Sequence, residues 1–184
     1  MIGLNIGQQV LRDFGRADAL DPDSFMKGLK SGLGGDRPLD GPAMREAVIA
    51  YRVEVIKQDA VKFMDENKKK EGVKATASGL QYQVITSGAP GGKSPKATSQ
   101  VRVHYTGTLV NGTKFDSSVD NGKPIEMAVS DFVPGWVEGL QLMKEGDKWR
   151  LFVPPELGYK EKGKGNVPPH AVMIFEMELL KVLD

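Results

Sequence analysis

The hydrophobic pattern of the first 72 residues is helical, and it predicts two short amphipathic helices before residue 40. Apolar residues recur every four positions along the first helix: Ile2, Ile6, Val10 and Phe14. Asp21 followed by Pro22 is typical of the start of the second helix, and Gly34 with Gly35 is typical of its end.

A third and longer helix is predicted to start at the capping residue Asp40 and to end before Gly72. Its two apolar stripes are Met44, Val48, Tyr51 and Val55, and Ile49, Val53, Ile56, Ala60 and Phe63. Residues 47–56 are therefore apolar nearly all round, and such a helix needs cover on several sides. Two short helices of the same chain supply too little, so we expect a second copy of the chain to cover the rest.

From Leu80 the pattern changes to the period of two that is typical of strands. Residues 80–85 and 101–106 alternate in this way, and Asn111-Gly112 predicts a hairpin whose returning strand holds Phe115. A short helix is predicted from about Gly135, with three apolar residues on one face: Trp136, Leu140 and Met143. Residues 148–153 and 172–182 complete the pattern. The expected architecture is an antiparallel sheet with one helix packed across it.

Charge and cysteine content limit the function classes. The 25 basic and 24 acidic residues leave a net charge of +1, which gives no broad field for nucleic acid or an anionic membrane. Lys68–Lys70 form the densest basic run, but without interleaved aromatic residues they indicate a solvated helix end in preference to a nucleic-acid site. The absence of cysteine excludes disulfides and thiolate chemistry and leaves the redox compartment open. No apolar run reaches the length of a membrane span.

A series of motifs follows in fixed order in the second half of the chain. They are Val-His-Tyr-Thr-Gly at 103–107, Lys-Phe-Asp-Ser-Ser at 114–118, Val-Pro-Gly-Trp at 133–136, Leu-Gly-Tyr at 157–159, Val-Pro-Pro-His-Ala at 167–171 and Phe-Glu-Met-Glu-Leu at 175–179. This set resembles the ligand pocket of FKBP-type peptidyl-prolyl isomerases. The resemblance implies an α+β fold, in which a helical segment is followed by an antiparallel FKBP-type sheet wrapped on one short helix.

The N-terminal part carries a second resemblance. Residues 2–7 and 67–81 are similar to the dimerisation segment of macrophage-infectivity-potentiator-like bacterial isomerases. This resemblance implies a helical dimerisation domain over 1–72 with a long connecting helix, an isomerase domain over 73–184, and a homodimer held by the N-terminal helices. It also implies export to the periplasm or the bacterial outer surface after removal of a signal peptide, with a cytoplasmic location as the alternative.

The resemblance to FKBP-type isomerases also assigns the site residues. The catalytic set is Tyr105, Phe115, Asp116, Val133, Trp136, Tyr159 and Phe175, and the substrate-binding set is Ile125, Phe132 and Val167. Trp136 would form the floor under the proline ring, Tyr159 and the Val133 N–H would donate to substrate carbonyls, and Asp116 would accept from Tyr105 or orient a polarised carbonyl. The implied partners are proline-containing polypeptides and macrolide inhibitors, with no cofactor or metal.

Three positions depart from the family pattern, and two rival interpretations remain. Ile125 stands where an aromatic wall is frequent, Asn121 where an arginine is common, and Lys160 where a glycine usually follows the tyrosine. The alternative to the isomerase function is a peptide-binding chaperone module without turnover.

An acid/base pair of Asp116 and Asp120 is disfavoured, because nothing typical of a sugar site accompanies it. His104 and His170 are interpreted as structural, since neither has a second ligand at metal-binding spacing.

Overall fold

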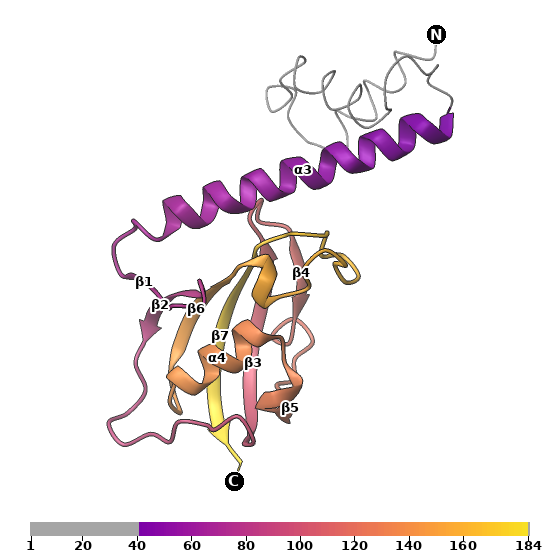
Figure 1. Ribbon diagram of the computed structural model, residues 1–184. Helices are drawn as coiled ribbons and strands as arrows, with labels where there is room; N and C mark the ends of the chain where they lie inside the picture. The colour runs from indigo at the N-terminus through magenta and orange to yellow at the C-terminus, as the bar shows by residue number, and fades with distance from the viewer. Residues whose placement is uncertain (1–40, 184) are drawn as a thin grey trace. The chain divides into compact units, whose positions relative to one another are not determined.

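The computed structural model describes residues 41–183 of the chain, with side chains from Ile49 onward. The helices expected before residue 40 lie outside the described residues. The expected third helix is α3 (Gly41–Asn67), and α4 (Pro134–Leu142) is the expected short helix (Figure 1). α3 ends at Asn67, so Lys68–Lys70 form a turn after the helix and not its last turn, with the Lys70 N–H donating to Asn67 O at 3.0 Å.

Contacts divide the chain into two compact units, residues 1–55 and 56–184. The division falls within α3, and the last turns of this helix belong with the sheet. The sequence predicts a boundary after residue 72, and whether the part from Val73 folds by itself stays a prediction.

Within the described residues, seven strands form one sheet in which every pairing is antiparallel, in the order β1-β2-β6-β7-β3-β4, with β5 also on β3. The strands are β1 (Val73–Ala75), β2 (Gln81–Thr86), β3 (Gln100–Leu109), β4 (Lys114–Ser117), β5 (Ile125–Ala128), β6 (Lys148–Val153) and β7 (Met173–Val182). The strands predicted at 80–85, 101–106, 148–153 and 172–182 are confirmed as β2, β3, β6 and β7. The predicted hairpin is confirmed as well, because Gly112 has a φ of +83° between β3 and β4.

The helix α4 lies across one face of the sheet, over β7 and β3 (Figure 1). Its predicted apolar face is confirmed: Trp136 is 4% exposed, and Leu140 and Met143 are fully buried. Close approach to β6 requires glycine on this face, because a Cβ at Gly135 would lie 2.6 Å from Val153 Cγ1 and one at Gly139 2.9 Å from Leu151 Cδ1. The helix and the strands share one hydrophobic core.

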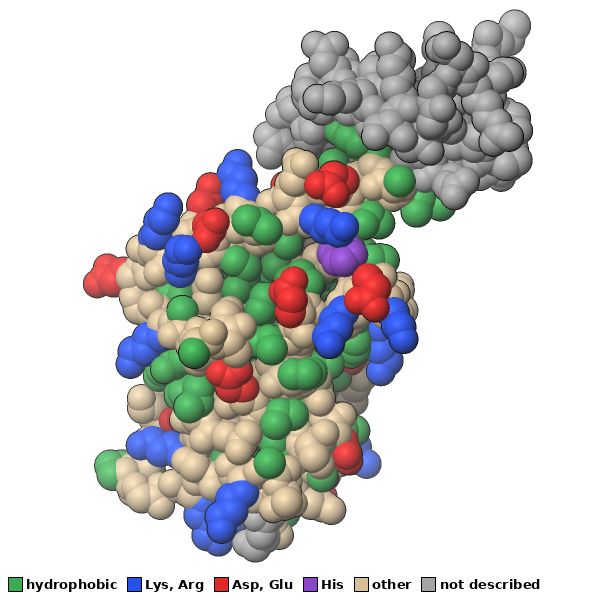
Figure 2. Space-filling model, in the orientation of Figure 1, with side chains coloured by type: hydrophobic (Ala, Val, Ile, Leu, Met, Phe, Trp, Pro, Cys, Tyr) green, Lys and Arg blue, Asp and Glu red, His purple; other side chains and the backbone are tan. Residues whose placement is uncertain are grey.

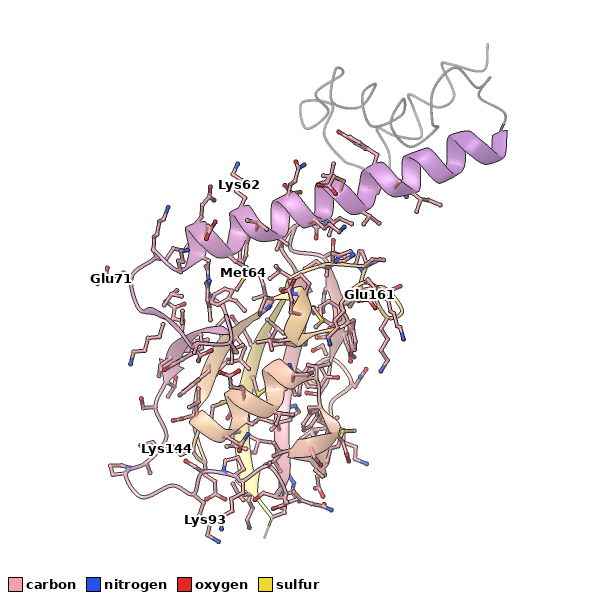
Figure 3. The ribbon with its side chains drawn as sticks, viewed as in Figure 1. Lys62, Met64, Glu71, Lys93, Lys144 and Glu161 are labelled. Atoms are coloured by element: carbon pink, nitrogen blue, oxygen red, sulfur yellow. The ribbon has the colours of Figure 1, made fainter. Side chains whose placement is uncertain are left out.

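The last turns of α3 pack on the sheet. The ring of Phe63 lies 6.0 Å from that of Phe152 on β6, centroid to centroid. Figure 3 shows Met64 pointing from α3 toward the sheet and Lys62 pointing away from it. The Gln81 side chain of β2 donates to Met64 O at 2.8 Å, so a polar strand residue is covered by the helix end.

The face drawn in Figure 2 carries hydrophobic side chains among acidic and basic ones, without a continuous patch of one sign. Two short 3-10 helices, η2 (Val129–Asp131) and η3 (Pro155–Leu157), lie on either side of α4 and β6 in the sequence. Neither α3 nor α4, the two α-helices described, has the length and apolar composition needed to cross a membrane.

Candidate active site

A cavity of about 360 Å³ collects almost all the residues that the sequence assigns to the site. Its lining comes from β3, β4, β5, β7, η2, α4 and the segments beside them: Tyr105, Phe115, Asp116, Ile125, Met127, Asp131, Phe132, Val133, Trp136, Tyr159, Lys164 and Phe175. All the predicted residues except Val167 are among them. A space of this size, lined mainly by aromatic and aliphatic side chains with a few polar groups, is typical of a small-ligand site.

Aromatic rings meet edge to face at the floor of the cavity. The Trp136 ring lies 4.9 Å from the ring centroid of Tyr105 at 77°, and 4.9 Å from that of Phe175 at 88°. Phe115 stands at 89° to Phe175 with centroids 5.6 Å apart, and Phe132 lies 4.8 Å from Trp136. Such pairs add roughly 0.5–1.5 kcal/mol each beyond their buried area, so the rings of the floor stabilise one another.

Gly107 of β3 makes room for two of these rings. A Cβ at this position would lie 2.6 Å from Phe115 Cζ and 2.9 Å from Phe175 Cε1. Both distances are far below ordinary contact, so any side chain here would displace the two rings from their packed positions. This explains in physical terms why the motif at 103–107 ends in glycine.

One polar pair sits at the edge of the aromatic floor. The Tyr105 hydroxyl donates to Asp116 Oδ2 at 2.5 Å, as the sequence predicts. Burial raises the pKa of Tyr105 well above its usual range, and the hydrogen bond to Asp116 and the charge of that carboxylate raise it further. The phenol therefore stays protonated and keeps donating to the carboxylate over the whole physiological pH range.

Val133 and Tyr159, which the sequence assigns as hydrogen-bond donors, both belong to the cavity lining. Val133 caps α4 from an extended conformation, and none of the backbone hydrogen bonds of the described turns and caps uses its N–H. Tyr159 lines the cavity from the loop after β6, with Lys164 Nζ 5.4 Å from its ring centroid. The cavity therefore combines an aromatic surface with a backbone N–H and a phenol hydroxyl among its lining residues.

Val167, predicted as a wall, lies outside the lining of this cavity. It is 4% exposed within the core, and its backbone pairs with that of Lys164 through hydrogen bonds of 3.0 and 2.9 Å. Its structural role is to fix the loop that carries Lys164 into the lining. Val167 is buried because the loop folds back on itself at Lys164, and the motif at 167–171 does not predict this fold of the loop.

Sequence reasoning missed three lining residues: Met127, Asp131 and Lys164. Met127 follows Ile125 by two positions on β5, so strand alternation would have found it once β5 was known. Asp131 directly precedes the aromatic Phe132 in the motif region. Lys164 carried no signal, since it lies among five other charged or glycine positions of a loop.

The three departures from the family pattern have distinct outcomes. Ile125 lines the cavity, so this wall is aliphatic. Asn121 leaves Asp116 with the Tyr105 hydroxyl as its hydrogen-bond donor among the described residues. Lys160 adopts a φ of +51°, in the left-handed region that favours glycine, which costs a side-chain-bearing residue about 1–2 kcal/mol.

A second cavity, of about 390 Å³, lies on the opposite face of the sheet, beneath the last turns of α3. It is slightly larger, but its lining is a mixture of Phe63, Phe152, four aliphatic residues, two threonines, two amides and the Arg150–Glu176 ion pair. Without an aromatic floor it resembles a space between packed elements. Among the side chains described, from Ile49 to Leu183, no three acidic or histidine residues gather where they could hold a metal ion.

Known proteins include relatives that are similar to this chain over nearly its whole length. Residues 91–180 match the family model described as FKBP-type peptidyl-prolyl cis-trans isomerase, and residues 1–84 match that of the domain amino-terminal to such isomerases. The chain is 44% identical to the FKBP-type 22 kDa peptidyl-prolyl cis-trans isomerase of Escherichia coli K12, covering 99% of this chain and 92% of the relative. It is 36% identical to the outer membrane protein MIP of Legionella longbeachae, covering 89% and 76%.

Solved structures agree with the sequence relatives. The crystal structure of FkpA from Escherichia coli matches with a TM-score of 0.66 at 29% identity, covering 98% of this chain and 92% of that one. A peptidyl-prolyl cis-trans isomerase from Pseudomonas syringae matches with a TM-score of 0.65 at 34% identity, covering 71% and 95%.

Proposed function

The chain belongs to the FKBP-type peptidyl-prolyl cis-trans isomerases and is an enzyme of that activity, and from this premise we propose that the cavity floored by Trp136 is its active site. The proposal rests on one observation: residues from β3, β4, β5, α4, the loop after β6 and β7 converge on one aromatic space. The substrates are proline-containing polypeptide segments, and macrolide inhibitors of the FKBP class compete for the same floor.

Rotation about a prolyl bond makes no new bond, and its barrier of about 18–20 kcal/mol comes from the loss of amide resonance. The planar amide has more charge separation than the twisted amide. Transfer from water into an apolar cavity therefore destabilises the ground state relative to the transition state. Trp136, Phe175 and Phe115 supply that apolar surface, and no nucleophile is needed.

The polar groups at the cavity edge hold the peptide while the bond rotates. The Val133 N–H and the Tyr159 hydroxyl each have a carbonyl oxygen of the bound segment as acceptor. Asp116 holds Tyr105, so the ring edge stays against Trp136. A rate gain of 10⁴–10⁶ requires roughly 5–8 kcal/mol, which desolvation and two hydrogen bonds supply together.

A matched pair of carboxylates tests this proposal. Asp116→Asn weakens the contact with Tyr105, whereas Asp120→Asn removes a carboxylate that pairs with Lys114 at 2.6 Å outside the cavity. In a protease-coupled assay on an X-Pro peptide, Asp116→Asn is expected to lower kcat/KM about two- to tenfold and Asp120→Asn to leave it within about twofold. Equal effects of the two changes would contradict the assigned site.

The same assay separates the alternative function. A peptide-binding chaperone module would bind an X-Pro peptide or a macrolide at micromolar protein and leave the isomerisation rate at its uncatalysed value. Acceleration that is abolished by a macrolide of the FKBP class supports the enzyme assignment at this cavity. Acceleration that persists when the macrolide is bound would place turnover elsewhere in the chain.

We also propose that the chain acts as a homodimer with chaperone-like holding of non-native polypeptides. Ile49 and Val61 of α3 are 61% and 64% exposed, so this helix offers apolar surface for a partner. The match of residues 1–84 to the domain amino-terminal to FKBP-type isomerases supports a separate role for this part. Sedimentation equilibrium at tens of micromolar should give twice the 20.0 kDa chain mass, and a 20.0 kDa species would contradict the dimer.

Export to the periplasm or outer surface is the proposed location. The similarity to a relative named outer membrane protein MIP supports it. Cell fractionation tests it: recovery of the protein with periplasmic or outer-membrane markers supports export, and recovery with cytoplasmic markers overturns it.

A further inference from the structure

Ser118 occupies a gap in the sheet next to Tyr105. On this edge of β3, β5 pairs with residues 100–103 and β4 pairs with residues 106–108. Positions 104 and 105 therefore have no strand partner on that side. Tyr105, whose ring and hydroxyl both enter the candidate site, lies in this gap.

Ser118 makes the hydrogen bonds to the Tyr105 backbone that a paired strand would otherwise make. The Tyr105 N–H donates to Ser118 Oγ at 2.8 Å, and the Ser118 N–H donates to Tyr105 O at 3.0 Å. Ser118 Oγ also lies 3.3 Å from Tyr105 O and 3.0 Å from His104 Nδ1. With the Nδ1-protonated tautomer of His104, the hydroxyl accepts from that N–H and from the Tyr105 N–H and donates to Tyr105 O, which uses its one donor and two acceptor positions.

Ser118 is 2% exposed, so water does not replace it. Its backbone also holds the turn after β4, because the Lys123 N–H donates to Ser118 O at 3.2 Å. Asp116 lies two residues before Ser118 on the same segment. Both ends of the Tyr105–Asp116 contact are thus tied to one short stretch of chain.

We infer that Ser118 is a positioning residue for the isomerase site, and that its hydroxyl holds the Tyr105 backbone so that the phenol reaches Asp116. This inference rests on the proposed active site. Ser118 acts through Tyr105 and touches no substrate.

The adjacent Ser117 provides a matched control. It is also buried, at 4% exposure, but its hydroxyl bonds to the Thr106 hydroxyl at 2.9 Å and accepts from the Asp120 N–H at 3.2 Å, and it reaches Tyr105 O only at 3.5 Å. Ser117→Ala and Ser118→Ala remove the same atom from neighbouring buried sites. Only Ser118→Ala removes the acceptor of the Tyr105 N–H.

Two measurements test the inference on full-length protein whose circular dichroism matches that of the wild type. In the isomerase assay, Ser118→Ala is expected to lower kcat/KM about three- to tenfold, and Ser117→Ala to change it by less than about twofold. In the Tyr105→Phe background, Ser118→Ala should change kcat/KM by less than about twofold, because there is no hydroxyl left to position. In alkaline titration, Ser118→Ala should move the ionisation of Tyr105 toward that of a free tyrosine.

The outcomes separate this inference from the proposed site. If Tyr105→Phe leaves activity intact, the assigned polar pair is wrong and this inference falls with it. If Tyr105→Phe lowers activity while Ser118→Ala behaves like Ser117→Ala in both measurements, only the role of Ser118 is overturned. Should Ser118→Ala fail to fold, Ser118→Cys replaces it, and the weak thiol is expected to give a smaller change in the same direction; no change would overturn the inference.

Discussion

The Asn67 side chain donates from Nδ2 to Gln81 Oε1 at 3.0 Å and so joins the last residue of α3 to the first residue of β2. Both side chains are buried, at 1% and 4% exposure. Gln81 in turn donates to Met64 O at 2.8 Å. The end of the long helix is therefore fixed to the isomerase domain by a short chain of buried hydrogen bonds.

Removal of this link should destabilise the isomerase domain. Asn67→Ala leaves the buried Gln81 oxygen without its donor, which costs about 1–3 kcal/mol. Asn166→Ala, at an exposed loop position, is the matched control and should change the free energy of unfolding by less than about 0.5 kcal/mol. Urea unfolding followed by tryptophan fluorescence measures both, and equal values would show that the link contributes nothing.

The ionisation of Tyr105 should set an alkaline limit to stability. Its pKa in the folded protein lies above the ordinary value of about 10, because of burial and the hydrogen bond to Asp116. This contribution to stability is complete below pH 10 and is lost as pH rises toward the folded pKa, because the unfolded chain ionises first. The difference in phenolate absorbance between wild type and Tyr105→Phe isolates this group among the 4 tyrosines. A midpoint near 10 would show that the hydroxyl is free of Asp116.

Tyr159→Phe should reduce catalysis without disturbing the fold. It removes one hydroxyl from the cavity lining and leaves the ring in place. The loss of one hydrogen bond to a substrate carbonyl corresponds to about 0.5–1.5 kcal/mol, or two- to tenfold in kcat/KM. Tyr82→Phe is the control, since Tyr82 stacks on Trp149 outside this cavity. A loss of activity in the control alone would contradict the role of Tyr159.

Lys164 should influence which residues are preferred beside the proline. Its ammonium group stands next to the Tyr159 ring in the cavity lining. Lys164→Glu is expected to lower kcat/KM for a peptide with glutamate before proline about two- to fivefold relative to one with lysine, the range of an exposed charge pair. Lys162→Glu makes the same charge change outside the lining and should leave the ratio of the two peptides unaltered. If Lys164→Glu leaves the ratio of kcat/KM for the two peptides unchanged, Lys164 has no role in substrate selection.

The sequence predicts the main strands and α4 because their patterns are strong and local. Strand β5 escaped prediction, since Ile125–Ala128 is too short for a clear alternation and owes its conformation to pairing with β3. The three-residue β1 was missed for the same reason. Gln81 contradicts simple alternation, because the polar residue is buried under the end of α3 while Val84, on the expected inner face, is 39% exposed.

The candidate site, like the fold, could be predicted from the sequence only in part. The resemblance carried by the ordered motifs predicts the aromatic floor and the Tyr105–Asp116 pair, and the structure brings these residues together, because they lie in the strands and helix that the motifs define. Lys164 and Val167 depended on how one loop folds back on itself, with Gly163 at a φ of +62° and Gly165 at +56°. Tertiary contacts decide which side of such a loop faces the cavity, so local sequence does not predict it.

The two tryptophans allow the most direct test of the central claim that the cavity is the active site. Trp136 and Trp149 are both buried, at 4% and 7% exposure, but only Trp136 lines the cavity. Their replacement by leucine should cost similar stability. The measurement is the cis-trans exchange rate of an X-Pro peptide by NMR, at a temperature where both variants are folded. Trp136→Leu is predicted to lose at least about tenfold in catalysed exchange while Trp149→Leu stays within about twofold; equal exchange rates in the two variants would contradict the assignment.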